Sequence, residues 1–320
     1  MKSAMSPLPS VALIAGPTAS GKSALAIALA RALRTAGREA LIINADASGV
    51  YRDIPILSAQ PSRADQADVA HALVGHIDAA ENCNAARWVE EARAAIDAAT
   101  AEGIIPIIAG GTGLYIKTLL EGIAPVPDIP PEVREEARAL PVADAHAQLA
   151  RLDPVSASRL RPTDTTRVQR ALEVVLGTGK PLTHWQQQNV GGIAERIDLT
   201  PLILLPPRDW LRARCDTRLE AMGKAGALEE VQALLARRLD PALPAMRAIG
   251  VPEFAAHLSG SCSLAEALVQ AQAATRQFAK RQYTFFRGQF PAEWERLDKE
   301  LNDSLIDELA IKLRDRLLTG

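Results

Sequence analysis

The first 120 residues alternate continuous apolar runs of strand length with segments of helical periodicity. The predicted strands are residues 11–15, 39–45 and 104–109, and the predicted helices are residues 22–35, 85–99 and a helix from residue 114. Strands that are apolar at nearly every position are buried on both faces, as in parallel sheets. The pattern therefore predicts an α/β fold in which a parallel sheet has helices on both faces.

The pattern changes after residue 122, where the proline-rich stretch APVPDIPP begins. Residues 132–188 are typical of helices, and a strand-like run returns at 198–205. Helices enclosed between strands of one sheet indicate an inserted domain. We therefore divide the chain into a core of residues 1–121 and 195–320, with a helical C-terminal part, and a helical insertion domain of residues 122–194.

Composition sets the broad class of the protein. The chain has 320 residues, of which 48% are hydrophobic and 23% charged, as is ordinary for a globular protein. No apolar run approaches the roughly 18 residues of a membrane span, and the N-terminus lacks the apolar core of a signal peptide. We expect a cytoplasmic protein without a membrane partner. The formal charge of −2 argues against indiscriminate nucleic-acid binding but is blind to local patches.

One motif points directly to phosphate. The stretch GPTASGKS fits G-x-x-x-x-G-K-[ST] and lies between a predicted strand and a predicted helix, the context that a phosphate-binding loop requires. Its backbone N–H groups and the Lys22 ammonium hold phosphate oxygens, and the Ser23 hydroxyl can reach Mg²⁺. The predicted phosphate ligands are Gly16, Pro17, Thr18, Ala19, Ser20, Gly21, Lys22 and Ser23. Nothing in the motif specifies ATP.

An acidic residue that nucleotide hydrolases usually have is missing from this sequence. Such proteins carry a carboxylate at the end of a core strand to hold Mg²⁺, but the strand at 104–109 ends in Gly-Gly-Thr-Gly. The nearest strand-end acid is Asp46, which we place beside the strand of the phosphate-binding loop. Asp46 can serve a metal, a substrate or only the following turn. Its place at the carboxyl edge of a parallel strand favours function.

Two clusters of basic residues offer surfaces for an anionic partner. In a predicted helix near the C-terminus, Arg276, Lys280 and Arg287 share one face with Tyr283, while Phe278 and Phe285 lie opposite. Such a face suits RNA backbone contact and base stacking, although a solvated helix face gives the same pattern. In the insertion, four arginines crowd the start of a helix capped by Thr163 or Asp164, against the helix dipole. They are Arg159, Arg161, Arg167 and Arg170.

Taken together, the chain resembles the tRNA dimethylallyltransferases. The motifs that carry the resemblance are GPTASGKS, INAD-x-x-x-VYR, GGTGLYI, RPTDTTRVQRALEV, MRAIG and TRQFAKRQYTFFRG, in this order over nearly the whole chain. The resemblance implies transfer of a dimethylallyl group from dimethylallyl diphosphate to the exocyclic amine of the adenosine 3′ of the anticodon. It also implies dependence on Mg²⁺ and an insertion that clasps the anticodon stem-loop. We expect a monomer.

The resemblance also implies roles for individual residues. Asp46 is the expected general base, Thr18 lies near the leaving oxygen, and Arg218 stabilises the departing diphosphate. The target base must leave its stack to reach this site. The residues expected to contact tRNA are Asp46, Ala47, Ser48, Gly49, Thr112, Arg167, Gln169, Arg170, Ala171, Leu172, Glu173, Arg247, Lys280, Arg281, Tyr283 and Arg287.

The chain departs from the family pattern next to Asp46. Ala47 and Gly49 stand where the family typically has serine and glutamine, so a glutamine expected near the target base is absent. Three alternatives therefore stay open: a tRNA-binding homologue with impaired catalysis, an isopentenyltransferase for a free adenine nucleotide, and a phosphate-binding-loop kinase. The insertion and the arginine clusters count against the second, and the missing second acid against the third.

Overall fold

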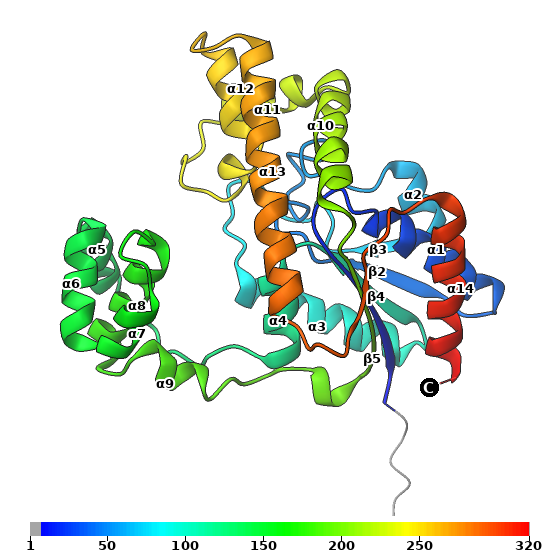
Figure 1. Ribbon diagram of the computed structural model, residues 1–320, viewed down its shortest axis with the longest axis horizontal. Coiled ribbons are helices and arrows are strands. Elements are labelled where there is room, and N and C mark those ends of the chain that lie inside the picture. Colours follow the sequence, from blue (N-terminus) through cyan, green and yellow to red (C-terminus); the bar gives the residue numbers. More distant parts are fainter. Residues whose placement is uncertain (1–7, 320) are drawn as a thin grey trace, which may run out of the picture. The chain divides into compact units, whose positions relative to one another are not determined.

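The computed structural model describes residues 8–319 and contains a six-stranded parallel sheet (Figure 1). The strand order is β3-β2-β4-β1-β5-β6. The bounds are β1 (Ser10–Ala15), β2 (Ala40–Asn44), β3 (Ala70–Ala72), β4 (Ile105–Gly110), β5 (Asp198–Leu204) and β6 (Glu295–Leu297). The inner strands are short apolar runs because both of their faces are covered, so the predicted fold class is confirmed.

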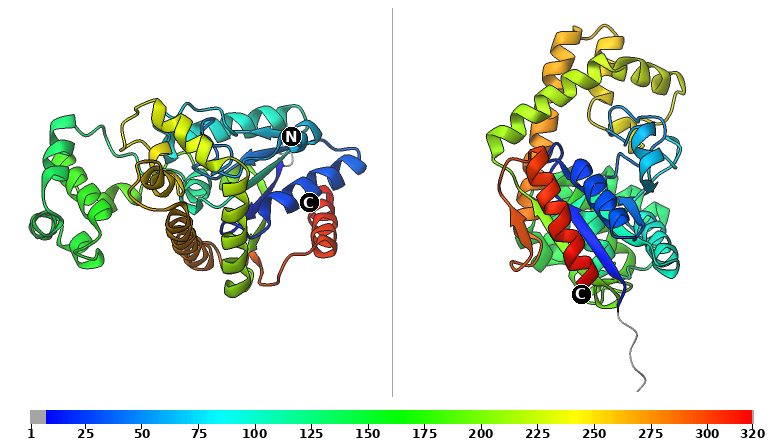
Figure 2. Two further views of the ribbon diagram at one scale, coloured as in Figure 1. Left: turned by 90° about the horizontal axis from the view of Figure 1, so that it is seen from above. Right: turned by 90° about the vertical axis from the view of Figure 1, so that its right-hand side faces the viewer.

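Helices cover both faces of this sheet. On one face, α1 (Lys22–Thr35) and α14 (Asp303–Thr319) lie side by side and share an apolar core with β1, β2, β4 and β5 (Figures 1 and 2). The other face carries α3 (Ala85–Ala101), with Trp88 fully buried, and α4 (Gly113–Glu121). A short helix, α2 (Arg63–Asp68), precedes β3. Helix α1 begins and ends where the sequence predicts.

The C-terminal part of the core is a group of packed helices. They are α10 (Arg208–Lys224), α11 (Ala227–Ala236), α12 (Val251–Leu258) and α13 (Leu264–Gly288). The 25-residue helix α13 starts at a capping box, in which the Ser263 hydroxyl accepts from the Glu266 N–H and the Glu266 carboxylate accepts from the Ser263 N–H. Because α13 packs along α10 and reaches the start of α4, it spans the edge of the sheet where the candidate site lies.

Residues 120–193 form a separate compact unit, whereas the other residues form the core. The helices of this unit are α5 (Pro131–Ala139), α6 (Val142–Leu152), α7 (Pro154–Arg159), α8 (Thr165–Thr178) and α9 (Leu182–Gln186). Helix α8 is capped by Asp164, whose carboxylate accepts from the Arg167 N–H, and ends at Gly179 with positive φ. Val168, Leu172 and Val175 line its buried face, as the spacing predicts.

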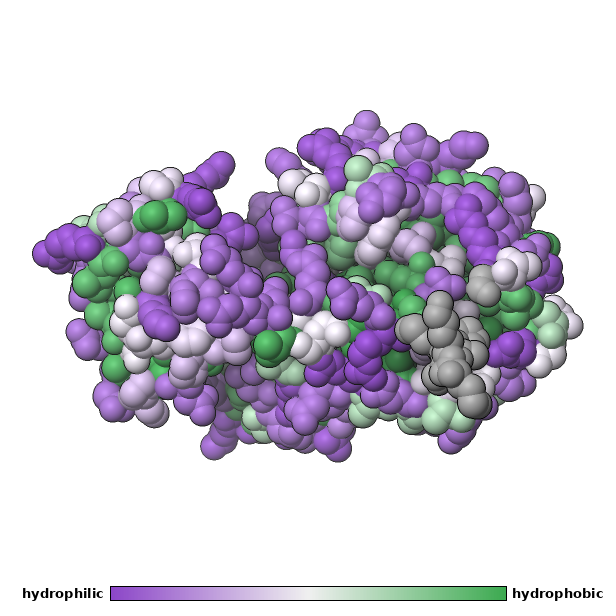
Figure 3. All heavy atoms as spheres, turned by 90° about the horizontal axis from the view of Figure 1, so that it is seen from below, coloured by the Kyte–Doolittle hydropathy of each residue, from purple (hydrophilic) through white to green (hydrophobic). Residues whose placement is uncertain are grey.

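Two expectations about the sheet need correction. Strand β2, which precedes Asp46, lies beside β4 and not beside β1. Strands β3 and β6 are not predicted from the sequence, since each has only three residues and is defined by pairing with another strand. On the face drawn in Figure 3, hydrophilic residues predominate and apolar residues gather in small groups. Among residues 8–319, no helix has the length and apolar character needed to cross a membrane.

Candidate active site

Three loops meet at the carboxyl edge of the sheet because β2, β4 and β1 are neighbours. The phosphate-binding loop follows β1, Asp46 follows β2, and Gly111-Thr112 follow β4. In parallel sheets, ligands bind outside the carboxyl ends of the strands, where the connections diverge to the two sides. Residues more than 60 positions apart in the sequence therefore converge at one point.

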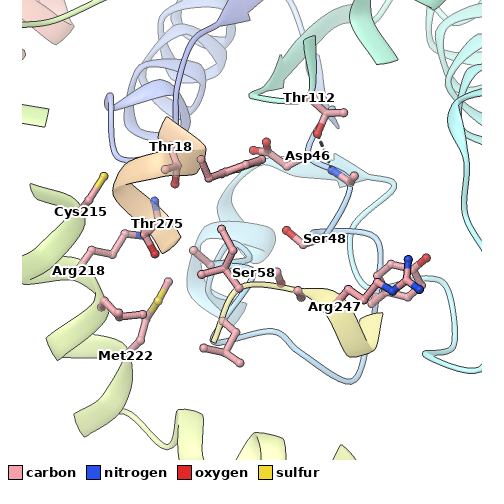
Figure 4. A pocket seen from close by; sticks show the side chains of 18 of the residues that line it. Thr18, Asp46, Ser48, Ser58, Thr112, Cys215, Arg218, Met222, Arg247 and Thr275 are labelled. Carbon is pink, nitrogen blue, oxygen red and sulfur yellow. Dashed lines mark hydrogen bonds between the residues drawn. The ribbon is translucent and has the colours of Figure 1, made fainter. Parts of the chain in front are cut away.

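A cavity of about 390 Å³ opens at this point. It is bounded by the three loops, by α10 and α13, and by two further loops that carry Leu57 and Arg247. Figure 4 shows Arg218 and Arg247 entering from opposite sides, with Ser48 and Ser58 between them. Thr18, Lys22, Ser23, Asp46 and Arg218 all line this cavity, so the structure brings the predicted phosphate and catalytic residues together.

The phosphate-binding loop is held in shape by its own contacts. Gly16 has φ +155°, and a Cβ there would lie 2.5 Å from the Leu204 carbonyl, so only glycine fits. The Pro17 carbonyl accepts from the Ser20 N–H and from Lys22 Nζ. Ser20 is fully buried and does not line the cavity. Gly16, Pro17 and Ser20 therefore shape the loop, whereas Thr18, Lys22 and Ser23 face the cavity.

One buried and one partly buried cation, Lys22 and Arg218, give the cavity its electrostatic character. Lys22 is 7% exposed, and burial is the main cause that lowers the pKa of its ammonium from the ordinary value of 10.5. Burial likewise lowers the pKa of the Arg218 guanidinium, and the Asp46 carboxylate opposes both changes. With two cations shielded from water and one carboxylate, the cavity favours an anionic ligand that carries more than one charge.

The loops after β2 and β4 are locked to each other. The Gly111 N–H donates to Asp46 Oδ1 at 2.6 Å, and the Ala47 N–H donates to Thr112 Oγ1 at 2.9 Å. Asn44 Oδ1 accepts from the Asp46 N–H, which fixes the backbone of the acid. Asp46 thus faces the cavity with a defined carboxylate orientation, and the option that it only caps a turn does not account for this placement.

Part of the cavity lining is apolar, a property that the motifs do not predict. Leu57, Leu219, Met222, Ile249 and Phe278 contribute to it. The Leu57 loop is held by the partly buried Glu230 carboxylate on α11, which accepts from the Ile56 and Leu57 N–H groups at 2.7 and 2.9 Å. A cavity that combines cations, a phosphate-binding loop and apolar side chains suits a ligand with both an anionic and an apolar part.

A divalent metal fits the residues at the polar end. The Ser23 hydroxyl, on the first turn of α1, and the Asp46 carboxylate both line the cavity. Mg²⁺ prefers oxygen ligands and commonly binds one or two protein groups, substrate phosphates and water. In the part of the chain that the structure describes, no group of three or more His, Cys, Asp or Glu side chains forms a metal site without a substrate.

Comparison with known proteins decides the family. The family model described as IPP transferase matches residues 49–289. The chain is 60% identical over 309 residues to the tRNA dimethylallyltransferase of Sphingopyxis alaskensis, covering 97% of this chain and all of that protein. This chain belongs to the IPP transferase family. The resemblance recognised from its motifs is thereby confirmed.

Other IPP transferases support the same assignment. The chain is 54% identical to the tRNA dimethylallyltransferase of Erythrobacter litoralis, over 91% of this chain and 92% of that one. The solved structure of the full-length tRNA isopentenylpyrophosphate transferase from Bacillus halodurans is similar, with a TM-score of 0.69, 28% identity and 97% coverage of each chain. A eukaryotic dimethylallyltransferase acting on tRNA matches with a TM-score of 0.74 and 28% identity, over 87% of this chain and 70% of that one.

The structure divides the tRNA residues expected from the family into three groups. Asp46, Ala47, Ser48, Thr112, Arg247 and Arg281 line the cavity. Lys280 and Arg287 are exposed on α13. Gly49 does not line the cavity; a Cβ at this position would lie 3.0 Å from the Asn44 side-chain amide. The position of the missing glutamine is therefore closed by Asn44.

The expected orientation of α13 is partly wrong. Arg276 forms an ion pair with Asp216 of α10 at 2.6 Å. Tyr283 donates from its hydroxyl to the Leu205 carbonyl, and its ring lies under the Arg208 guanidinium, so it is not a free platform for a base. Phe278, expected to face a core, lines the cavity beneath Arg281. Helical periodicity could not reveal which side of α13 packs on α10.

The expected contacts of α8 also need correction. Arg167 and Arg170 are exposed, with 76% and 44% of their side chains accessible. Gln169 donates to the Arg138 carbonyl. Ala171, Leu172 and Glu173 are buried, and Glu173 pairs with Arg138 and Arg170. Burial excludes direct contact of these three side chains with RNA in this structure, because they form the inner face of the helix.

Proposed function

We propose that this protein transfers a dimethylallyl group from dimethylallyl diphosphate to the exocyclic N6 of the adenosine 3′ of the anticodon in tRNA, releasing diphosphate. Its relatives at 50–60% identity are tRNA dimethylallyltransferases. We propose that it acts as a monomer. We place the protein in the cytoplasm, where tRNA is available.

The observation that carries this proposal is the pair of cations at the phosphate-binding loop, of which Lys22 is buried and Arg218 partly buried. Rupture of the allylic C–O bond leaves the electron pair on the diphosphate oxygen. Lys22 and Arg218 face the space where this charge develops, and cations that have lost part of their hydration act strongly on it because little water screens them. Thr18, on the same loop, completes the cradle beside the leaving oxygen. The apolar part of the lining accepts the five-carbon chain.

The acceptor is activated on the other side of the cavity. The N6 lone pair forms the new bond to the carbon that carried the diphosphate, and the proton that N6 loses passes to the Asp46 carboxylate. Asp46 suits this role because Gly111 orients its carboxylate while leaving it open to the cavity. Ser48 and Arg247 line the same cavity, and we place the incoming base beside them (Figure 4).

Magnesium completes the polar end of the site. Ser23 and the diphosphate oxygens would hold Mg²⁺, which supplies further charge stabilisation to the leaving diphosphate. The protein's own contribution is to fix the loop, the two cations and the Ser23 hydroxyl around one volume.

The tRNA binds through exposed cations of the protein, and its target adenosine enters the cavity. Arg167 on α8 and Lys280 and Arg287 on α13 are exposed cations that can reach RNA phosphates. Arg170 remains 44% exposed although it pairs with the buried Glu173, because Glu173 also pairs with Arg138. A base within a stacked loop does not reach the cavity, so the adenosine must turn out of the anticodon loop.

The proposal is tested by comparing three acceptors in separate reactions. Purified protein, Mg²⁺ and labelled dimethylallyl diphosphate are incubated with unmodified tRNA, with the same tRNA carrying guanosine 3′ of the anticodon, or with adenosine monophosphate. Label should enter the first acceptor alone. Transfer to adenosine monophosphate at an equal rate would instead identify a nucleotide isopentenyltransferase.

A further inference from the structure

Gln282 is a buried polar residue that the proposed reaction does not use. It lies in α13 with 6% of its surface exposed, on the same face as the buried Ala279 and Phe286. A glutamine on an apolar helix face loses its hydration, so it stabilises the fold only if its amide is hydrogen-bonded.

Both ends of the Gln282 amide are engaged, and each contacts a different active-site loop. Its Oε1 accepts from the Thr18 N–H at 2.8 Å, and its Nε2 donates to the Gly111 carbonyl at 2.8 Å. Thr18 belongs to the phosphate-binding loop after β1, whereas Gly111 belongs to the loop after β4. One planar group thus spans two loops that no backbone hydrogen bond joins among the described residues.

The contact at Thr18 decides which amides of the loop remain for a ligand. The Thr18 N–H is used by Gln282 and the Ser20 N–H by Pro17. Within residues 8–319, the backbone N–H groups of Ala19, Gly21, Lys22 and Ser23 have no protein acceptor. These four N–H groups lie between Thr18 and the first turn of α1. They can bind one anion together only while the loop keeps its shape.

The hydrogen bond from Gln282 to Gly111 connects Gln282 to Asp46, the proposed general base. Gly111 donates its N–H to Asp46 Oδ1 and accepts from Gln282 with its carbonyl. A Cβ at Gly111 would lie 2.4 Å from Gln282 Nε2 and 2.9 Å from Asp46 Oδ1, so the three groups are in close approach and only glycine fits between them. The orientation of the Asp46 carboxylate therefore depends on Gln282 through a single residue.

We propose that Gln282 is a positioning residue, which fixes the phosphate-binding loop and the Asp46 carboxylate at the separation that transfer requires. This inference rests on the proposed function. An amide can fill the role because it accepts at one end and donates at the other, which neither a carboxylate nor a hydrocarbon of the same length does. Because α13 also carries Lys280, Arg281 and Arg287, the same helix links the RNA-facing cations to the donor site.

The test compares Gln282→Met, which keeps the volume and loses both hydrogen bonds, with Gln282→Asn, which keeps the amide but is one methylene too short to span both loops. Steady-state transfer is measured with dimethylallyl diphosphate and unmodified tRNA, and binding of inorganic pyrophosphate with Mg²⁺ is titrated separately. We expect the KM for the donor and the Kd for pyrophosphate to rise about tenfold and kcat to fall about tenfold in both variants. The KM for tRNA should stay within about twofold.

The matched control is Phe286→Leu, one helical turn further along the same buried face. It weakens the packing of α13 without touching either loop, so it should lower Tm and leave the donor KM and the pyrophosphate Kd unchanged. Equal donor effects in Phe286→Leu, or a folded Gln282→Asn with unchanged donor KM and kcat, would overturn the proposal. If the natural sequence binds pyrophosphate but transfers nothing, the proposed function fails, while a weaker pyrophosphate Kd in Gln282→Met still supports the contact with the loop.

Discussion

The Gly111 N–H donates to Asp46 Oδ1 at 2.6 Å, which joins the residue after β4 to the acid after β2. This bond holds one carboxylate oxygen and leaves the other available at the cavity. A base oriented in this way can accept a proton without first reorganising, and general-base catalysis contributes typically about 10² to 10⁴ in rate.

The first prediction concerns Asp46→Asn. The asparagine keeps the shape and can still accept from Gly111, but it cannot take the proton from N6. We expect kcat to fall at least about 100-fold, with the Kd for tRNA within about twofold of the natural value. Single-turnover kinetics and a filter-binding titration measure the two quantities. A large loss of tRNA affinity with little change in kcat would refute the assignment of Asp46 as the base.

The second prediction is that Lys22 lowers the stability of the protein without ligand. Burial lowers the pKa of Lys22 in the folded protein. The unfolded chain therefore binds this proton more tightly, so stability increases as the pH rises from the folded pKa to the ordinary value of 10.5. At neutral pH the charged form opposes folding, and Lys22→Met should raise the stability by about 1 kcal/mol while abolishing pyrophosphate binding.

The measurement is thermal unfolding at several pH values, with and without pyrophosphate. The natural sequence should show a rise in stability on the alkaline side that Lys22→Met lacks. Pyrophosphate should raise Tm for the natural sequence alone, because the bound anion compensates the buried charge. A lower Tm for ligand-free Lys22→Met at pH 7 would contradict the account of this site.

The third prediction concerns Arg170→Ala in α8. Removal of a cation that contacts a phosphate weakens binding and lowers the salt slope of log K by about 0.7 to 0.9. Glu173 keeps its ion pair with Arg138, so the fold of the unit should persist. Arg151→Ala, which removes an exposed arginine of the same unit outside the predicted set, is the control. Identical salt slopes for Arg170→Ala and the natural sequence would make Arg170 a solvated side chain only.

The fourth prediction addresses the family glutamine that is absent at Gly49. The Asn44 amide donates to the Asp46 and Leu73 carbonyls and accepts from the Asp46 N–H, so it has little freedom to move away from a new side chain. Gly49→Gln should therefore cost about 1 kcal/mol of stability and should not raise kcat. Urea unfolding and transfer kinetics check this. A variant that is as stable as the natural sequence and turns over faster would show that the space is available.

The sequence predicts those parts of the molecule whose signals are local. Helix α1 has both ends right because the phosphate-binding loop fixes its start and its apolar spacing continues to Thr35. The positions of Lys22, Asp46 and Arg218 around one cavity followed from the motifs and are found there.

Other parts depend on contacts between distant residues and could not be predicted. Strand β6 exists only through pairing with β5, some 90 residues earlier, and its segment has no apolar run. Arg276 pairs with Asp216 of α10, and Tyr283 contacts the Leu205 carbonyl and Arg208 at the start of α10. The periodicity of α13 does not encode these partners. Gln282 contacts a residue 264 positions away, yet one signal was present: it is a polar residue spaced three and four positions from the apolar Ala279 and Phe286.

The most direct test of the central claim is the chemical identity of the product. Unmodified tRNA is incubated with the protein, Mg²⁺ and dimethylallyl diphosphate, then digested to nucleosides and analysed by mass spectrometry. The account predicts a dimethylallyl group on N6 of the adenosine 3′ of the anticodon, with release of one diphosphate for each group transferred. Tight tRNA binding with every adenosine unmodified would contradict it and would favour a tRNA-binding protein without catalytic activity.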